Sequence, residues 1–343
     1  MEHIAIDLGA RESQVCVRAA DGTILLEGRH PTVALRAFLG QRPSSRVVLE
    51  TCAEAFGVAA VARELGHEPV VVPASLARAL GVGTRGLKSD VRDARHLSEA
   101  SCRMARLPAV HVPALQSQAR KGECALREAL VTTRTKLVNT VRGWLRGQTA
   151  GPLRRCTPPR LPARVRAHLA AHGQAVPDAV ERVLHVIEAL NGQIRAADAA
   201  LTALAQEDAV CRRLMTVPGV GPVTAVRFAA AVDDVQRFPR ASAVQSYLGL
   251  VPGEDSSAER RRITGITKAG PSRVRWTLIQ AAWCVRRLRP QDPAVQWARR
   301  VESRRGRPVA AVALARKLAG ILYAIWRDGA VYDPQHSATR RAA

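Results

Sequence analysis

Two short apolar runs near the start of the chain each end in an acidic residue, which constrains both the fold and the chemistry. Residues 4–6 are followed by Asp7, and residues 47–49 are followed by Glu50. Runs of this length and composition predict buried strands of a sheet. An acid that ends such a strand lies at the edge of the sheet, where it can meet other polar groups.

A second acidic pair, Asp90 and Asp93, opens an expected helix, and a spacing of three places both residues on one helix face. Together with Asp7 and Glu50 they can converge on one point. Carboxylate oxygens suit Mg²⁺, and two such ions can hold the attacking and leaving oxygens of a phosphodiester. We therefore predict that these four acids are catalytic metal ligands for nucleic-acid chemistry, with Mg²⁺ as the cofactor. For Asp90 alone, the alternative is a carboxylate that favours the helix dipole.

The order of expected elements in residues 1–112 indicates an α/β domain. Three strands come first, the last two joined by an Asp21-Gly22 turn, and helices and strands then alternate. The expected strands cover residues 4–7, 15–18, 24–27, 47–50 and 70–72, and the expected helices cover 33–39, 53–65 and the segment with the acidic pair. This is the order of the ribonuclease H-like fold.

Basic residues are concentrated in the later part of the chain. The 343 residues include 52 Lys and Arg against 29 Asp and Glu, a formal charge of +23. Residues 1–112 hold 14 of the basic and 12 of the acidic side chains, which leaves a net charge of +21 for residues 113–343. Such a charge attracts polyanions, and phosphate contacts usually dominate affinity for nucleic acid. A nearly neutral catalytic domain followed by a cationic binding region is therefore predicted.

Other classes of protein fit the sequence less well. The seven cysteines include no Cys-x-x-Cys pair, and the nine histidines show no metal-ligand spacing. Neither a zinc site nor a disulfide framework is expected, and a reducing cytoplasm fits. The sequence shows no signal peptide and no apolar stretch long enough to span a bilayer, so we expect a soluble protein without a membrane partner.

Residues 113–208 are expected to be mostly helical. Two long helices, at about 116–144 and 177–206, flank a break rich in Pro and Arg at 151–162. Apolar residues at helical spacing in the second helix predict an antiparallel pair or a coiled coil. Such a region serves either as a spacer or in oligomerisation or RNA binding.

Residues 209–343 contain two features expected near nucleic acid. The turn Pro218-Gly-Val-Gly predicts a helix-hairpin-helix, in which Gly219 and Gly221 let the backbone approach a DNA phosphate; the alternative is an ordinary tight turn between helices. The second feature is a loop at 249–259. It contains Ser256 and Ser257 and is followed by the basic residues Arg260, Arg261, Arg262 and Lys268. Helices are expected at 271–288, 293–305 and 308–327.

Taken in order, these motifs resemble the insertion-sequence-110 family, the DEDD-type transposases related to bacterial pilin-gene invertases. The resemblance covers nearly the whole chain. Besides the strands that end in Asp7 and Glu50, it rests on Lys88-Ser-Asp-Val-Arg-Asp-Ala, the Pro218 turn, Gly249-Leu-Val-Pro, the serine pair, Gly265-Ile-Thr-Lys and Ala315-Arg-Lys-Leu-Ala.

The resemblance implies a RuvC-like domain whose four acids bind Mg²⁺ and a C-terminal domain that supplies a serine nucleophile. Ser257 aligns with that serine, but Ala258 stands where the family usually has Gly, so Ser256 is an alternative. Ser89 stands at a position where Thr is common, and Thr-Cys-Ala follows Glu50 in place of a Gly-rich run. The resemblance also implies donor and target DNA as partners, a noncoding guide RNA, and catalytic halves that meet between protomers.

We therefore predict a DNA transposase or site-specific recombinase in three parts: a RuvC-like catalytic domain (1–112), a helical coiled-coil region (113–208) and a C-terminal transposase domain (209–343). A dimer or tetramer is expected, in the bacterial cytoplasm and associated with the nucleoid. The expected nucleic-acid contacts are Lys88, Gly219, Gly221, Arg260, Arg261, Arg262 and Lys268.

Three alternatives remain at this point. One is a stand-alone RuvC-like nuclease that cuts branched DNA by metal-activated water and has no need of Ser257. Another is an actin-like or sugar-kinase ATPase, since an apolar strand that ends in Asp-Leu-Gly also opens that fold, although a second Gly-rich phosphate motif is lacking. The third is a non-catalytic nucleic-acid-binding protein.

Overall fold

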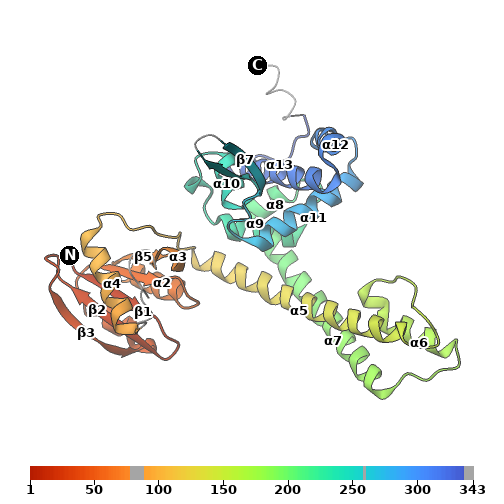
Figure 1. Cartoon of the computed structure of the whole chain (residues 1–343), viewed down its shortest axis with the longest axis horizontal. Helices are drawn as coiled ribbons and strands as arrows, with labels where there is room; N and C mark the ends of the chain where they lie inside the picture. Colours follow the sequence, from red (N-terminus) through yellow and green to blue (C-terminus); the bar gives the residue numbers. More distant parts are fainter. Residues whose placement is uncertain (78–88, 258–259, 336–343) are drawn as a thin grey trace. The chain divides into compact units, whose positions relative to one another are not determined.

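The computed structural model describes residues 1–77, 89–257 and 260–335 (Figure 1). The chain divides into two compact units, Met1–Leu115 and Gln116–Ala343. The expected coiled-coil region belongs to the second unit. The division into three functional parts stays a prediction.

A five-stranded sheet in the order β3-β2-β1-β4-β5 forms the centre of the first unit. Its strands are β1 (His3–Asp7), β2 (Glu12–Arg18), β3 (Ile24–Pro31), β4 (Arg46–Glu50) and β5 (Glu68–Val72). The first three pair antiparallel, whereas β4 runs parallel to β1 and β5 parallel to β4. The structure confirms the predicted mixed α/β unit, and this strand order is compatible with a ribonuclease H-like domain.

Helices cover both faces of this sheet. Along β1, Ile4 and Ile6 face the side covered by α1 (Leu35–Gly40) and α2 (Ala55–Glu64). Ala5 faces the opposite side, where it shares a core with Leu97 of α4 (Asp90–Arg103). Because side chains alternate along a strand, each face of the sheet has its own core. Two short segments, η1 (Thr32–Ala34) and α3 (Ala74–Ala77), complete the helices described in this unit.

Two long helices, α5 (Leu115–Arg146) and α7 (Asp178–Glu207), run antiparallel in the second unit (Figure 1). Buried positions on α7 recur at intervals of three and four, the heptad pattern of a coiled coil; they are Val180, Leu184, Ile187, Asn191, Ile194, Leu201 and Ala205. The predicted antiparallel pair is confirmed. Sequence reasoning missed α6 (Leu161–Ala170), because it saw only a break in the Pro-rich segment, whereas Pro at a helix start suits the first turn.

Three polar pairs cross the α5–α7 interface at positions seven residues apart on α5. Arg120 binds Asp208 at 2.6 Å, Arg127 binds Asp198 at 2.8 Å, and Arg134 Nη1 donates to Asn191 Oδ1 at 3.0 Å. Polar residues at core positions of a coiled coil favour one register over others. These pairs therefore fix how the two helices are aligned.

The remaining helices pack around α13 (Arg307–Asp328) in one core. They are α8 (Ala209–Leu214), α9 (Pro222–Val232), α10 (Ala241–Tyr247), α11 (Ser272–Leu288) and α12 (Pro293–Arg305). Within the described ranges, α13 is the one helix long and apolar enough to cross a membrane, yet 50% of its apolar window is buried in the protein. Its buried residues include Leu314, Leu318 and Leu322, which is the pattern of a core helix.

The loop predicted at 249–259 is wrong for much of its length, because the segment begins a two-stranded hairpin. Its strands are β6 (Pro252–Ser257) and β7 (Arg260–Ile266). Pro-Gly-Glu-Asp-Ser-Ser has none of the alternating apolar pattern that predicts a strand. The strands pair because contacts with distant parts of the chain hold the base of the hairpin, as described below.

Candidate active site

Asp7 and Glu50 end two neighbouring parallel strands that are in register at the preceding position. Alternate residues of a strand face the same side, so Asp7 shares the side of Ala5, and Glu50 shares that of Val48. Ala5 and Val48 lie in the core on the α4 face of the sheet. Both acids are therefore placed side by side at one edge of the sheet, on the face that α4 covers.

α4 runs opposite to β1, which brings its first turn to the same edge. At the other end, His3 Nδ1 and Ser101 Oγ are 2.7 Å apart. From His3 to Asp7 the strand rises about 13 Å, and from Ser101 back to Asp93 the helix covers about 12 Å. Asp93 therefore lies level with Asp7 along the sheet.

Polar contacts fasten α4 to the antiparallel strands. Both nitrogens of a two-point contact from Arg95 lie 2.6 Å from the carboxylate oxygens of Glu27 on β3. On the buried side, Arg18 Nε donates to Ser98 Oγ at 2.8 Å. Ser89 caps the helix start, since its Oγ accepts the N–H of Arg92 at 3.4 Å. The hydroxyl that Ser89 shares with Thr is the group that this cap uses.

The two acids of α4 differ in burial. Asp93 is 3% exposed, and its Oδ1 is buried without a hydrogen-bond partner in the part of the chain that the structure describes. Asp90 is exposed, and its Oδ2 lies 3.8 Å from Nη2 of Arg29 on β3. An unsatisfied buried polar atom costs on the order of 1–3 kcal/mol, and more when it is charged. The fold thus keeps an unfavourable buried carboxylate at the edge that carries Asp7 and Glu50.

The turn after Asp7 is held by side-chain hydroxyls. Thr32 Oγ1 donates to the carbonyl of Gly9 at 2.7 Å and lies 2.8 Å from Ser13 Oγ. A Cβ on Gly9 would lie 2.3 Å from the carbonyl oxygen of Glu12, so a larger residue cannot fit without a shift of the backbone. The position of Asp7 is therefore fixed on both sides, by its strand and by this turn.

The segment after Glu50 is also fixed, although it lacks a Gly-rich run. The N–H of Thr51 donates to the carbonyl of Val72 at 3.0 Å, and Thr51 Oγ1 accepts the N–H of Ala74 at 2.9 Å. Thr51 thereby joins the ends of β4 and β5. The Thr side chain that departs from the family pattern is the group that makes the second of these contacts.

Across residues 1–77, 89–257 and 260–335, no three His, Cys, Asp or Glu side chains are gathered closely enough to hold a metal ion. The four acids therefore share one region of the sheet edge without forming a closed cluster. The unpartnered Oδ1 of Asp93 is nevertheless an atom that a cation would satisfy, and carboxylates are the ligands that Mg²⁺ takes. The residues at this edge fit a divalent metal ion.

In the second unit, Ser256 and Ser257 end β6, and Ser257 pairs with Arg260 across the hairpin. For these serines and for the arginines at 260–262 the structure describes only the backbone. Lys88 lies outside the described residues. Lys268 is exposed at the far end of the hairpin, in a left-handed conformation with φ 56°.

The base of this hairpin is held by unusually close backbone contacts. Gly249 has φ 65°, and a Cβ there would lie 2.2 Å from the carbonyl oxygen of Ala269. Gly270 approaches Tyr247 in the same way, with 1.9 Å between its ideal Cβ and the Tyr247 carbonyl oxygen. Only glycine is compatible with both the positive φ and the approach. The two segments that flank the hairpin are therefore interlocked.

Arg275 of α11 completes this base and was missed by sequence reasoning. Its side chain is buried, and its Nη1 donates to the carbonyls of Leu248 and Ala269 at 2.9 Å each. One guanidinium thus joins both flanks of the hairpin to α11. The sequence carried no signal for this role, because Arg275 is one of many arginines and its partners are backbone atoms.

The Pro218-Gly-Val-Gly turn joins α8 to α9, but a helix-hairpin-helix is not confirmed. Gly219 has φ 84°, and a Cβ there would lie 2.7 Å from the carbonyl oxygen of Ala281 on α11. Its close approach is therefore to a helix of the same chain. Gly221 begins α9 as its N-cap, and a Cβ there would meet nothing within 4 Å.

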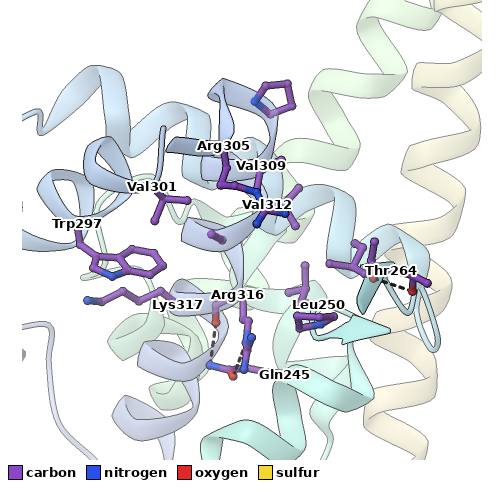
Figure 2. Close-up of a pocket in the computed structure, with 15 residues that line it drawn as sticks. Gln245, Leu250, Thr264, Trp297, Val301, Arg305, Val309, Val312, Arg316 and Lys317 are labelled. Atoms are coloured by element: carbon purple, nitrogen blue, oxygen red, sulfur yellow. Dashed lines mark hydrogen bonds between the residues drawn. The ribbon is translucent and has the colours of Figure 1, made fainter. Parts of the chain in front are cut away.

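A cavity of about 910 Å³ lies beside the hairpin, lined by β6, β7, α10, α12 and α13 (Figure 2). Trp297 and Val309 are among its apolar residues, and Lys317 lies 5.0 Å from the centroid of the Trp297 ring. Arg316 Nε donates to Gln245 Oε1 at 3.0 Å (Figure 2). Sequence reasoning missed this cavity because its lining comes from segments up to seventy residues apart.

Comparison with known proteins places these features in a family. A model described as "Transposase", for the DEDD transposases of the IS110 type, matches residues 4–149. A second, described as "Transposase IS116/IS110/IS902 family", matches residues 211–296. Among relatives, the "Putative transposase y4qE" of Sinorhizobium fredii is 32% identical over 80% of this chain and 73% of its own length. The chain belongs to the IS110 transposase family.

Two further relatives of this IS110 transposase carry the names of insertion sequences. The "Transposase for insertion sequence element IS1328" of Yersinia enterocolitica is 27% identical, over 96% of this chain and 98% of its own length. The "Transposase for insertion sequence element IS1111A" of Coxiella burnetii is 32% identical, over 69% and 66%. The first family match spans all four acids of the sheet edge, and the second spans the serine hairpin.

Family membership confirms the predicted class of enzyme, a transposase that acts on DNA. A DEDD transposase domain also implies dependence on a divalent metal ion in general. The ATPase alternative is thereby set aside. The identity of the metal, the nucleophile and any RNA partner belong to the proposal below.

Proposed function

We propose that this IS110 transposase cuts and rejoins DNA with a serine nucleophile, assisted by Mg²⁺ held at the edge where Asp7, Glu50, Asp90 and Asp93 lie. The observation that carries the proposal is the buried Oδ1 of Asp93, unpartnered among the described residues and level with Asp7. A purely structural protein gains nothing from such an atom. Bound Mg²⁺ would polarise the scissile phosphate and neutralise the charge that develops on it.

Ser257 is the proposed nucleophile. Its Oγ attacks the phosphorus of the scissile phosphate, the bond from phosphorus to one DNA oxygen breaks, and that oxygen leaves as a hydroxyl after taking a proton. The DNA is then joined to Ser257 by a phosphodiester. A free hydroxyl of another strand reverses the step, so the bond energy is conserved and no ATP is needed. A serine hydroxyl is weakly nucleophilic at its own pKa and needs activation.

The backbone of the hairpin supports this role for Ser257. Ser257 is the last residue of β6, and residues 258–259 alone separate it from its pairing partner Arg260. The base of the hairpin is fixed by Gly249, Gly270 and Arg275. A catalytic group is most effective when rigid elements hold it in place. Ser256 is the alternative, one position further from the tip.

The test is a covalent-adduct assay with labelled DNA that contains the ends of the element. After incubation with Mg²⁺ and denaturation in detergent, the wild-type protein should retain label, and Ser256→Ala should retain it as well. Ser257→Ala should not, and Asp93→Asn should also fail. Adduct from Ser257→Ala but not from Ser256→Ala would move the role to Ser256. Normal strand cleavage by both serine variants without any adduct would favour a nuclease that uses metal-activated water.

We further propose that an element-encoded noncoding RNA guides the choice of donor and target DNA, and that the protein acts as a homo-oligomer, dimer or tetramer, in the bacterial cytoplasm and at the nucleoid. The net charge of +21 after residue 112 and an aromatic content of 3% favour backbone contacts over base stacking as the main mode of binding. Lys88, Gly219, Gly221, Arg260, Arg261, Arg262 and Lys268 are the proposed nucleic-acid contacts.

The RNA proposal is tested by expressing the protein with its native flanking DNA and sequencing the RNA that copurifies. One defined transcript, with segments that match donor and target, would support guided recombination. Sequence-specific joining that survives RNase treatment of the complex would contradict it. Light scattering of the purified complex then gives the number of protomers.

A further inference from the structure

A hollow of about 640 Å³ between α11 and α12 concentrates positive charge. Four of its lining residues are arginines, and one is acidic. The lining comprises Trp283, Arg286, Arg287, Arg299, Glu302, Ser303 and Arg307. Neither the family motifs nor the proposed serine chemistry uses this site.

The single acid leaves most of this charge uncompensated. Glu302 binds Nη2 of Arg286 through one oxygen and Nε of Arg307, at 3.1 Å, through the other. The hydrogen bond from Arg286, together with the nearby arginines, holds the pKa of Glu302 below its usual value, so the carboxylate is already committed to partners inside the site. Arg287 and Arg299 are both exposed at the hollow. The site carries a formal charge of +3.

Arg286 also has a donor that lacks an acceptor. Its Nη1 is buried and makes no hydrogen bond within the described part of the chain. Arg286 side-chain exposure is 12%, so bulk water does not readily serve this group. A phosphate oxygen that enters the hollow would supply an acceptor, and arginine suits phosphate because its guanidinium offers several donors in one plane.

Trp283 adds an aromatic surface at the same place. Its side chain is 37% exposed, and the guanidinium carbon of Arg286 lies 5.2 Å from its ring centroid. Base stacking on aromatic side chains, beside cations that track the phosphates, is how proteins hold single strands. In a duplex the faces of the bases are covered by their neighbours, so an exposed indole beside a phosphate site fits an unpaired nucleotide better.

We propose that this hollow binds a single-stranded segment of nucleic acid, with a phosphate at the arginines and an adjacent base on Trp283. The inference rests on the proposed function only in taking nucleic acid as the ligand. It needs neither the serine nor the four acids. Trp283 lies eight residues beyond Arg275 on α11, about 12 Å along the helix from the base of the serine hairpin. A strand held here would thus be kept near that hairpin.

The test measures binding of fluorescent oligonucleotides of about 12 nucleotides, a length typical of single-strand sites, to the full chain in EDTA. Single-stranded DNA, single-stranded RNA and duplex DNA are compared. Trp283→Ala should weaken single-strand binding by about 5- to 150-fold, the range for the loss of one stacked base. The matched control is Trp276→Ala, which removes another exposed indole of α11 and should leave affinity unchanged.

The arginines are tested by the salt dependence of the same binding. Arg287→Gln with Arg299→Gln should lower the slope of log affinity against log salt by about 1.4, since each lost phosphate contact on a single strand contributes about 0.7. Arg300→Gln with Arg304→Gln, an equal change of charge on exposed residues of α12, should alter the slope far less.

Each outcome of these experiments decides something. Loss of affinity for DNA, for RNA or for both in the Trp283 variant supports the site and identifies its ligand. Unchanged affinity in Trp283→Ala, or duplex binding as sensitive to that variant as single-strand binding, overturns the proposal. Because no metal is present, Ser257→Ala should bind normally. A failure of the serine mechanism would therefore leave this result standing, and a failure here would not touch the serine mechanism.

Discussion

Replacement of Asp93 by Asn should stabilise the metal-free protein while it abolishes metal binding. The Oδ1 atom of Asp93 is buried and has no partner among the described residues. An unsatisfied buried polar atom costs about 1–3 kcal/mol, and removal of its charge recovers much of this. Against that stands a loss of about 0.3–1 kcal/mol, because Asp93 is in the first turn of α4, where a negative charge favours the helix dipole. The net expectation is a gain of about 0.5–2 kcal/mol.

For a unit the size of Met1–Leu115, each kcal/mol corresponds to about 3–6 °C in the melting temperature, so the expected rise is roughly 2–12 °C in EDTA. The assay is thermal unfolding of the full chain, followed by circular dichroism with and without Mg²⁺. Mg²⁺ should raise the melting temperature of the wild-type protein, because it binds only the folded state. The Asp93→Asn protein should show no such rise.

Glu99→Gln is the matched control for this substitution. It neutralises another carboxylate of α4, one that is 38% exposed and pairs with Arg103 at 2.6 Å. Exposed pairs of this kind contribute little, so its melting temperature should change by less than about 3 °C, and its response to Mg²⁺ should be normal. The reasoning is refuted if Asp93→Asn lowers the melting temperature in EDTA, or if Mg²⁺ stabilises that variant as much as the wild-type protein.

Three further predictions concern the second unit. Gly219→Ala should lower the free energy of unfolding by about 2–5 kcal/mol, from its left-handed φ and the close contact with α11, whereas Gly221→Ala should cost less than about 1 kcal/mol; equal effects in urea unfolding would contradict the packing role of Gly219. Burial opposes ionisation of Asp208, but hydrogen bonds from Cys211 and Arg120 hold its pKa below the usual value. Its stabilisation should therefore be present above about pH 4 and be lost as pH falls further, and Asp208→Asn should flatten that part of an acid-unfolding profile. Replacement of Arg134 and Asn191 together by Leu should raise stability by about 1–4 kcal/mol in urea, because Nε of Arg134 is buried without a partner in the described chain; a less stable double variant would show that the polar pair is favourable.

The first unit was the easier one to predict, because its site follows from local pattern. Runs of alternating burial identified β1 and β4, and a residue that ends a strand lies at the edge of the sheet whatever the rest of the chain does. The order of strands and helices then placed Asp7 and Glu50 on neighbouring strands. What the sequence did not contain was the difference between Asp90 and Asp93. Burial of Asp93 depends on how α4 is rotated, and this follows from the contacts of Arg95 and Ser98 with β3 and β2.

Prediction was poorer in the second unit because long-range contacts determine its local structure. The heptads of α7 were visible, but the polar pairs that set its alignment with α5 join residues 57 to 88 positions apart. The Pro-Gly-Val-Gly turn was interpreted as a phosphate site, since a glycine allows close approach to any group. The structure shows that the group approached by Gly219 is a backbone carbonyl of α11. Sequence alone cannot distinguish these two kinds of approach.

The serine hairpin shows how a weak local signal becomes a defined position. Pro252–Ser257 has little tendency to form a strand, and a Ser-Ser pair in a free loop would sample many conformations. Here both flanks of the hairpin are joined at its base, through Gly249 against Ala269 and through Arg275, which binds a carbonyl on each flank. Pairing then propagates from this base to Ser257 and Arg260. The residues that position the proposed nucleophile are therefore not its sequence neighbours. Loss of the Arg275 guanidinium should accordingly impair adduct formation by Ser257, even though Arg275 touches no DNA in this scheme.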